Sequence, residues 1–395
     1  MSVYAVTKDR LIEWLRDGRE LAVLDIRTAE EVGYASPLFA TNLPVDRLEA
    51  EIDRFIPRPV VRTVLVDDGK GSAEQAAERL AAKGWTDIHF LRGGIPAWIE
   101  GGVEALPTFD IPGVPFVQKV RSEKNTPVVF ARELKAWRDA GEDVVILDTR
   151  TLPEYEKAHV PSAIGVPGAE LLLRFSDLVP SPKTRVVVSC AGLPRAILGA
   201  QTLIDAGVEN DVSYLHDGTR GWTDDGFELE TGPSRTYSHV SANAKEIAEA
   251  RLKAFSRDDD LLFIDRPTAE TWLKDPSRTT YFLDVRTPEE FETSHLQGSI
   301  SSEGGQLLGV AYRTIAVRGA RVILVDDLLG ARARVVAHWL KRRGFEIALH
   351  LHDFEQGAEA AAALTRAGVR QTAPQTGICN DQCQPCLGFC AQQTF

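Results

Sequence analysis

The sequence predicts an α/β protein of three tandem domains, each a mainly parallel sheet flanked by helices, with a cysteine-rich C-terminal tail. The pattern Leu-Asp-x-Arg-Thr occurs three times, at 24–28, 147–151 and 283–287. After each copy, strand-like and helix-like segments alternate, which favours parallel strands joined by crossover helices. A chain of 395 residues is also too long for one ordinary domain.

A second strand follows each Leu-Asp-x-Arg-Thr copy and ends at a polar residue. These residues are Asp68, Cys190 and Asp327, which come 43, 42 and 43 residues after the aspartate of the pattern. Such similar offsets indicate duplication. The next helix and strand of each repeat are predicted at 73–83 and 88–91, at 195–206 and 212–215, and at 331–343 and 347–350. Each helix is followed by a glycine suited to a left-handed C-cap, namely Gly84, Gly207 and Gly344.

The polar and Pro/Gly-rich connections set the domain boundaries. We expect domains at 1–108, 120–233 and 240–370, and the tail at 371–395. The first connection runs from about 107 to 126, and the second, from 232 to about 260, contains a predicted helix at 242–255.

Charge and composition exclude several functional classes. Apolar residues make up 44% of the chain, which is enough for a core in each domain, and the net charge of −12 argues against binding to nucleic acid or anionic membrane. The first ten residues lack the pattern of a secretory signal, and no stretch approaches the length of a membrane span. We therefore expect a cytoplasmic protein that binds neither nucleic acid nor membrane.

Cys190 is the candidate nucleophile, because it is the one cysteine in the first 378 residues and it ends a strand. Backbone amides of the following loop, Ala191, Gly192 and Leu193, and the cation of Arg195 are expected to favour the thiolate. Aspartate in the sister domains indicates that the position is polar and accessible in all three, since a buried aspartate would be costly. The competing interpretation is a cysteine buried as a small hydrophobe.

The chain resembles the rhodanese superfamily, and in particular the multi-domain rhodanese-like sulfurtransferases of bacteria. The resemblance rests on the Leu-Asp-x-Arg-Thr strand end, on Glu154–Ala163, on the loop Cys190–Arg195 and on Asp217–Trp222. It covers nearly all of Val3–Gly368, and domain 2 carries all four features.

The resemblance implies a sulfurtransferase that requires no cofactor. Cys190 would take a sulfane sulfur from thiosulfate, mercaptopyruvate or a low-molecular-weight persulfide and hold it as a persulfide. The acceptor would be cyanide or a thiol, such as glutathione or a thioredoxin-like protein. The amides of Ala191, Gly192 and Leu193 would hold the persulfide, and Arg195 would steer an anionic donor. Asp148 and Arg150 would brace the loop and the neighbouring helix, while domains 1 and 3, with Asp68 and Asp327 at the cysteine position, would be inactive.

Two departures from the family pattern affect the choice of donor. Related proteins often have arginine and threonine where this chain has Leu193 and Pro194. Leu193 removes a cation and Pro194 removes an amide donor, which favours a less charged sulfur donor than thiosulfate. Two alternatives stay open: a cysteine-dependent phosphatase or arsenate reductase, and a non-catalytic scaffold in which Cys190 is a sensor thiol.

Four more cysteines, Cys379, Cys383, Cys386 and Cys390, lie in the tail. Thiolates suit a zinc or iron–sulfur site, although Pro385 and Gly388 oppose a continuous helix. The other two interpretations are incidental cysteines in a mobile, low-charge tail and a tail that accepts sulfur from Cys190 by thiol exchange.

Overall fold

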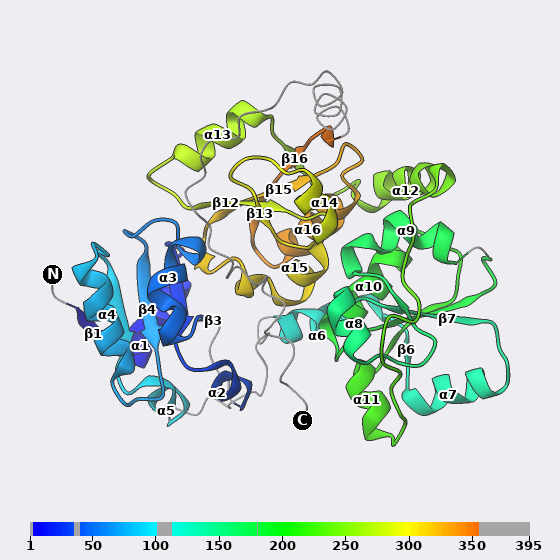
Figure 1. The fold of residues 1–395 in the computed structure, drawn as a ribbon, viewed down its shortest axis with the longest axis horizontal. Helices are drawn as coiled ribbons and strands as arrows, with labels where there is room; N and C mark the ends of the chain where they lie inside the picture. The colour runs from blue at the N-terminus through cyan, green and yellow to red at the C-terminus, as the bar shows by residue number, and fades with distance from the viewer. Residues whose placement is uncertain (1–2, 35–39, 101–112, 180, 355–395) are drawn as a thin grey trace, which may run out of the picture.

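The computed structural model describes residues 3–34, 40–100, 113–179 and 181–354. Within these residues the strands form three sheets, one for each sequence repeat (Figure 1). The predicted α/β class, with parallel sheets flanked by helices, is confirmed. In the described part of the chain, no helix has the length and apolar character needed to cross a membrane.

Domain 1 has the strand order β1-β5-β4-β2-β14, with β3 also paired to β2. Its own strands are parallel, whereas β14 comes from domain 3 and pairs antiparallel with β2. The elements are β1 (Tyr4–Val6), α1 (Lys8–Arg16), β2 (Leu21–Asp25), α2 (Ala29–Tyr34), β3 (Thr41–Asn42), α3 (Val45–Phe55), β4 (Arg62–Val66), α4 (Ser72–Ala82), β5 (Ile88–Leu91) and α5 (Gly94–Glu100).

Domain 2 has the parallel strand order β6-β10-β9-β7-β8. Its elements are α6 (Gly113–Lys124), β6 (Val128–Val129), α7 (Ala131–Asp139), β7 (Val144–Asp148), α8 (Leu152–Lys157), β8 (Ile164–Gly165), the 3₁₀ helix η1 (Gly168–Glu170), α9 (Leu171–Leu178), β9 (Arg185–Ser189), α10 (Pro194–Asp205), β10 (Val212–Leu215) and α11 (Gly218–Asp224).

Domain 3 repeats this order as β11-β16-β15-β12-β13, again parallel. Its elements are α12 (Ala242–Phe255), β11 (Leu262–Phe263), α13 (Arg266–Lys274), β12 (Thr280–Asp284), α14 (Pro288–Thr293), β13 (Ile300–Ser301), α15 (Gly304–Val310), η2 (Ala311–Arg313), β14 (Val317–Arg318), β15 (Arg321–Asp326), α16 (Ala331–Arg342) and β16 (Glu346–Leu351). The helix predicted at 242–255 is α12.

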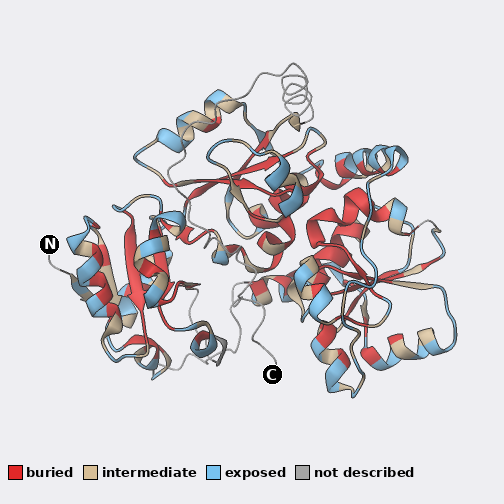
Figure 2. Cartoon of the chain, in the orientation of Figure 1, coloured by how far each residue is buried: buried red, intermediate tan, exposed pale blue. Residues whose placement is uncertain are grey.

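The central strands carry the core of each domain. β4 and β15 are buried along their whole length, and β9 is buried except at Arg185 (Figure 2). Continuous Val/Ile/Leu runs suit parallel strands with helices on both faces. The helices α4, α10 and α16 are followed by Gly84, Gly207 and Gly344 at φ of 101°, 72° and 88°, the left-handed conformation that a glycine C-cap allows.

The connection predicted at 107–126 contains a helix that the sequence pattern does not reveal. α6 spans Gly113–Lys124 and packs on α10, with Val117 and Val120 buried. Phe116 lies edge-on to Trp339 of α16, with the ring centres 6.3 Å apart. α6, which begins before the predicted boundary at residue 120, therefore packs on domain 2 and also contacts domain 3.

Domain 3 contacts both other domains and lies between them in Figure 1. Toward domain 1, β14 extends the sheet, and the hydroxyl of Tyr281 donates to the carbonyl of Phe55 at 2.5 Å. Toward domain 2, α15 packs on η1 and α10. This second interface brings α15 to the candidate active site.

Candidate active site

The strand register identifies which residues of the sister domains correspond to Cys190. Ser189 lies opposite Asp148, Val66 opposite Asp25, and Val325 opposite Asp284. The residues that follow these partners are Cys190, Asp67 and Asp326. The carbonyls of all three accept an amide from the chain beyond the next strand, at Thr219, Ile95 and His352.

The assignment of Asp68 and Asp327 to the cysteine position was therefore wrong by one residue. Both sister loops carry two consecutive aspartates, so the sequence alone does not decide between them, whereas the ladder of hydrogen bonds does. Asp68 instead forms a surface ion pair with Lys70. Asp327 is partly exposed and accepts the amides of Leu329 and Gly330.

In domain 1 the aspartate carboxylate fills the loop. Asp67 accepts the amides of Gly69, Gly71 and Ala73 at 2.9, 3.2 and 2.9 Å, and the hydroxyl of Ser72 at 3.0 Å. This loop and the first turn of α4 therefore form an anion-binding cradle with a built-in anion.

Domain 3 repeats this arrangement with fewer donors. Asp326 accepts the amides of Asp327 and Ala333, both at 2.9 Å. Ala333 stands in the first turn of α16, as Ala73 does in α4.

Cys190 lies in the corresponding cradle of domain 2. The amide of Gly192 donates to its Sγ at 3.3 Å. Burial is nearly complete, with 1% of the residue exposed. Burial raises the pKa of the thiol, and the charge of Arg195 and the amides of Gly192 and Ala196 oppose this only in part. The expectation of an accessible position was wrong, because the surrounding residues cover the side chain almost completely. Burial of the thiol also outweighs the stabilisation that the cradle gives to the thiolate.

Arg195 is held by the carboxylate of Glu154, a residue that was not predicted from the sequence to lie in the site. Its guanidinium forms a two-pronged ion pair with Glu154 at 2.6 and 2.9 Å. Glu154 also closes a capping box with Thr151 at the start of α8. Burial would raise the pKa of Glu154, but Arg195 and Arg150 outweigh it and hold that pKa well below its usual range. The Thr-x-x-Glu signature after the Leu-Asp-x-Arg-Thr pattern is the signal that could have revealed this residue.

Leu193 and Pro194 end the loop rather than contribute donors. Pro194 is the first residue of α10, where its missing amide costs nothing, and Leu193 is half-buried at the N-cap. Ala191 is exposed, and the half-buried Gly192 has no neighbouring atom within 4 Å of where a Cβ would lie. The open side of the loop is thus at Ala191 and Gly192.

Asp148 and Arg150 form a buried ion pair at 2.7 Å. Arg150 also donates to the carbonyl of Ala158, the C-cap of α8, at 2.6 Å. Domain 3 contains the same arrangement in Arg286, Asp284 and the carbonyl of Ser294. Domain 3 has no cysteine, yet it contains the same ion pair. We therefore interpret the pair as structural, because in both domains it fixes the following helix to the end of the strand.

Domain 3 covers the Arg195 side of the site. Gln306 of α15 donates from Nε2 to Glu154 at 3.2 Å. At Gly309, a Cβ would lie 2.9 Å from Cγ of Arg195, so the backbone of α15 rests directly on this side chain. The candidate site is therefore completed by a neighbouring domain.

No group of three or more His, Cys, Asp and Glu side chains in the described ranges is arranged to hold a metal ion. Cys379, Cys383, Cys386 and Cys390 lie outside those ranges, as does the rest of the predicted tail at 371–395. Zinc or iron–sulfur binding by the tail stays a prediction.

Comparison with known proteins identifies the family of the chain. The family model described as a rhodanese-like domain matches residues 7–100 and 130–225, in domains 1 and 2. The solved structure of a thiosulfate sulfurtransferase from Pseudomonas aeruginosa is 41% identical, with a TM-score of 0.84 over 90% of this chain and 67% of that one. The chain belongs to the rhodanese superfamily.

Among curated proteins the similarity is shorter. YrkF of Bacillus subtilis, named as a sulfur carrier protein, is 29% identical over 97 residues, which are 25% of this chain and 51% of that protein. An HTH-type transcriptional regulator of Mycobacterium tuberculosis is 32% identical over 100 residues, or 25% of this chain and 43% of that protein. The chain thus spans about half the length of the curated relatives that it matches.

Proposed function

We propose that the protein is a rhodanese-type sulfurtransferase that carries sulfur on Cys190. The observation that supports this most directly is the cradle around the sulfur. In the sister domains the same loop surrounds a buried carboxylate, Asp67 or Asp326, with amide donors. Domain 2 offers its cradle to a cysteine, so an anionic group attached to Sγ would find donors where the carboxylates find theirs.

The chemistry of such a site is a two-step displacement. The Cys190 thiolate attacks the terminal sulfur of thiosulfate, an S–S bond forms to Sγ, and sulfite leaves with the electron pair of the broken S–S bond. The resulting Cys190 persulfide carries one negative charge, which the amides of Gly192 and Ala196 stabilise. A nucleophile such as cyanide or a thiolate then takes the outer sulfur and restores the Cys190 thiolate.

Donor and acceptor are proposed from the charge of the site. The ion pair with Glu154 offsets part of the charge of Arg195, and Leu193 adds no cation. This favours a singly charged donor, such as a low-molecular-weight persulfide, over the thiosulfate dianion, with mercaptopyruvate as a further candidate. We propose a thiol acceptor, glutathione or a thioredoxin-like protein, in the cytoplasm, where thiols such as that of Cys190 stay reduced.

The proposal is tested by mass spectrometry of the intact protein after incubation with thiosulfate, mercaptopyruvate or glutathione persulfide. We expect the addition of one sulfur atom at Cys190 with at least one donor, its removal by cyanide as thiocyanate, and neither event in Cys190→Ser. A scaffold with a sensor thiol would show no selective addition. Cys190-dependent hydrolysis of p-nitrophenyl phosphate without sulfur addition would favour the phosphatase or arsenate reductase alternative.

A further inference from the structure

Domains 2 and 3 each contribute an equivalent residue, Glu170 or Gln306, that contacts the other domain next to its cradle. The amides of Gly168 and Gly304 bind the carbonyls of Thr149 and Val285, which are the residues after the Leu-Asp pair of each domain. Two residues further on stand Glu170 and Gln306, whose own amides bind the carbonyls of Pro167 and Glu303. Glu170 of domain 2 and Gln306 of domain 3 are therefore structural counterparts.

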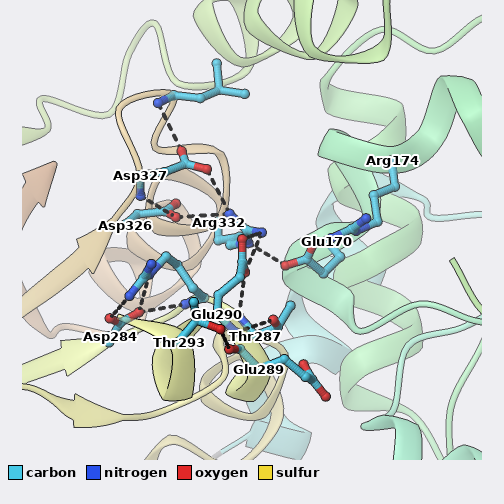
Figure 3. A network of polar contacts seen from close by, with 12 residues as sticks. Glu170, Arg174, Asp284, Thr287, Glu289, Glu290, Thr293, Asp326, Asp327 and Arg332 are labelled. Atoms are coloured by element: carbon cyan, nitrogen blue, oxygen red, sulfur yellow. Dashed lines mark hydrogen bonds and ion pairs between the residues drawn. The ribbon is translucent and has the colours of Figure 1, made fainter. Parts of the chain in front are cut away.

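Glu170 reaches into the cysteine-free loop of domain 3 (Figure 3). There its carboxylate binds Arg332, which also binds Glu290 at 2.9 Å, Asp327 at 3.1 Å and Asp326 at 3.3 Å. Arg332 is 1% exposed. This arginine is thus surrounded by carboxylates and has no capacity left for an anionic ligand.

Gln306 makes the reciprocal approach to the loop of domain 2. Arg195 is the counterpart of Arg332, since each precedes the alanine whose amide donates to the cradle residue, Cys190 or Asp326. Glu154 is the counterpart of Glu290, since each closes a capping box. Gln306 donates to Glu154 through a neutral amide, where Glu170 brings a negative charge to Arg332. Within the described part of the chain, Arg195 consequently has one carboxylate ion-pair partner, and its charge acts on Cys190.

We propose that Gln306 is a specificity-determining residue: the absence of charge on its side chain, beside Glu154 and Arg195, sets how much negative charge a sulfur donor can carry at Cys190. Its amide holds Glu154 against Arg195 without adding a charge, so that Arg195 keeps part of its field for the donor. This inference rests on the proposed sulfurtransferase function, and it assigns to domain 3 a part in donor selection.

Gln306→Glu tests the inference with two donors that transfer the same kind of sulfur, thiosulfate with two negative charges and methanethiosulfonate with one. An added charge acts on a dianion with twice the energy that it exerts on a monoanion, so a roughly tenfold loss of kcat/KM for thiosulfate goes with a roughly threefold loss for methanethiosulfonate. The ratio of the two kcat/KM values should therefore fall about threefold. Taking this ratio cancels any change in the thiolate fraction of Cys190, which affects both donors equally.

Three further variants give the matched comparisons. Gln306→Met removes the hydrogen bond without a charge, and Gln297→Glu adds the same charge at an exposed site of domain 3, so neither should change the ratio. Gln306→Lys should raise it, which keeps the test decisive if Gln306→Glu does not fold. If the wild type accepts sulfur from both donors and the ratio is unchanged in Gln306→Glu and in Gln306→Lys, the inference is overturned. A wild type that accepts sulfur from no donor overturns the proposed function instead.

Discussion

At the scale of single residues, Cys190 is subject to two opposed effects. The cradle stabilises a negative charge on sulfur, as the carboxylate of Asp67 in the sister loop shows, while removal from water destabilises it. Burial has the larger effect, so the thiol ionises above the ordinary pKa of cysteine. The thiolate fraction of Cys190 therefore rises over a higher pH range than that of an exposed cysteine.

Replacement of Arg195 should raise the pKa of Cys190 further, because Arg195 gives the largest stabilisation of the thiolate. We expect Arg195→Met to slow alkylation of Cys190 by iodoacetamide at pH 7.5 by about tenfold for each pKa unit gained, and to move the pH profile upward. Arg195→Lys keeps the charge and should restore much of the rate. Arg132→Met, on the surface of α7, serves as the control. A profile that stays in place in Arg195→Met would contradict this account.

The one-residue shift in the sister loops can be tested by stability. Asp67→Asn turns one acceptor of the cradle into a donor that faces backbone amides, and we expect it to cost domain 1 about 1–3 kcal/mol in urea unfolding. Asp68→Asn removes only a surface pair with Lys70 and should change stability by less than about 0.5 kcal/mol. Equal effects of the two substitutions would contradict the assignment of the Asp67 carboxylate as the anion of the cradle.

At the scale of elements, the start of α11 fixes the back of the cysteine loop. The amide of Thr219 binds the carbonyl of Cys190, and a Cβ on Gly218 would lie 1.9 Å from that oxygen. Gly218 also has a φ of 55°, which favours glycine. The loop and the helix can therefore approach each other only with glycine at this position.

Gly218→Ala should displace the Cys190 loop. Gly207→Ala is the matched control, since Gly207 also has a positive φ, of 72°, but a Cβ there would have no neighbouring atom within 4 Å. We expect about 1–2 kcal/mol of lost stability in Gly207→Ala from the left-handed conformation alone. Gly218→Ala should lose about 1–3 kcal/mol more from the clash, together with sulfur uptake at Cys190. Retained sulfur uptake in Gly218→Ala would show that the loop tolerates displacement.

The elements differ in how well the sequence predicts them. β5 and β10 begin and end as predicted at 88–91 and 212–215, because their Val/Ile/Leu content and the glycine before them are local signals. α6 was missed, since Gly113 and Pro115 at its start resemble a connection and its buried face consists of few residues. The pairing of Arg195 with Glu154, 41 residues away, depends on the packing of two helices, which no local pattern encodes.

At the scale of the whole molecule, domain 3 is held on domain 2 by a buried group of charges. Glu170 lies between Arg332 of domain 3 and Arg174 of its own domain. Burial raises the pKa of Glu170, but the two arginines lower it by more, so the pKa lies below its usual value. Asp326, in the same group, has a pKa raised to about 7 by burial. The cysteine-free loop of domain 3 thus forms part of the interface that brings Gln306 and α15 to the loop of domain 2.

The same interface should make stability depend on pH through Glu303, the N-cap of α15. Burial, together with the charge of Glu170, raises the pKa of Glu303 to about 8. The folded protein therefore holds a proton that the unfolded chain has released above about pH 4, and this contribution to stability is lost as the pH rises toward 8.

Glu303→Gln removes that loss, because glutamine stays neutral at every pH. We expect urea unfolding at pH 8.5 to show a variant more stable than the wild type by about 1.4 kcal/mol for each unit of the pKa shift that is realised in solution, with the difference vanishing near pH 4. Glu292→Gln on the exposed side of α14 should instead leave the pH dependence unchanged. If Glu303→Gln and the wild type lose stability in parallel between pH 5 and 8.5, then Glu303 is ionised in the folded protein and α15 is held against domain 2 without that proton.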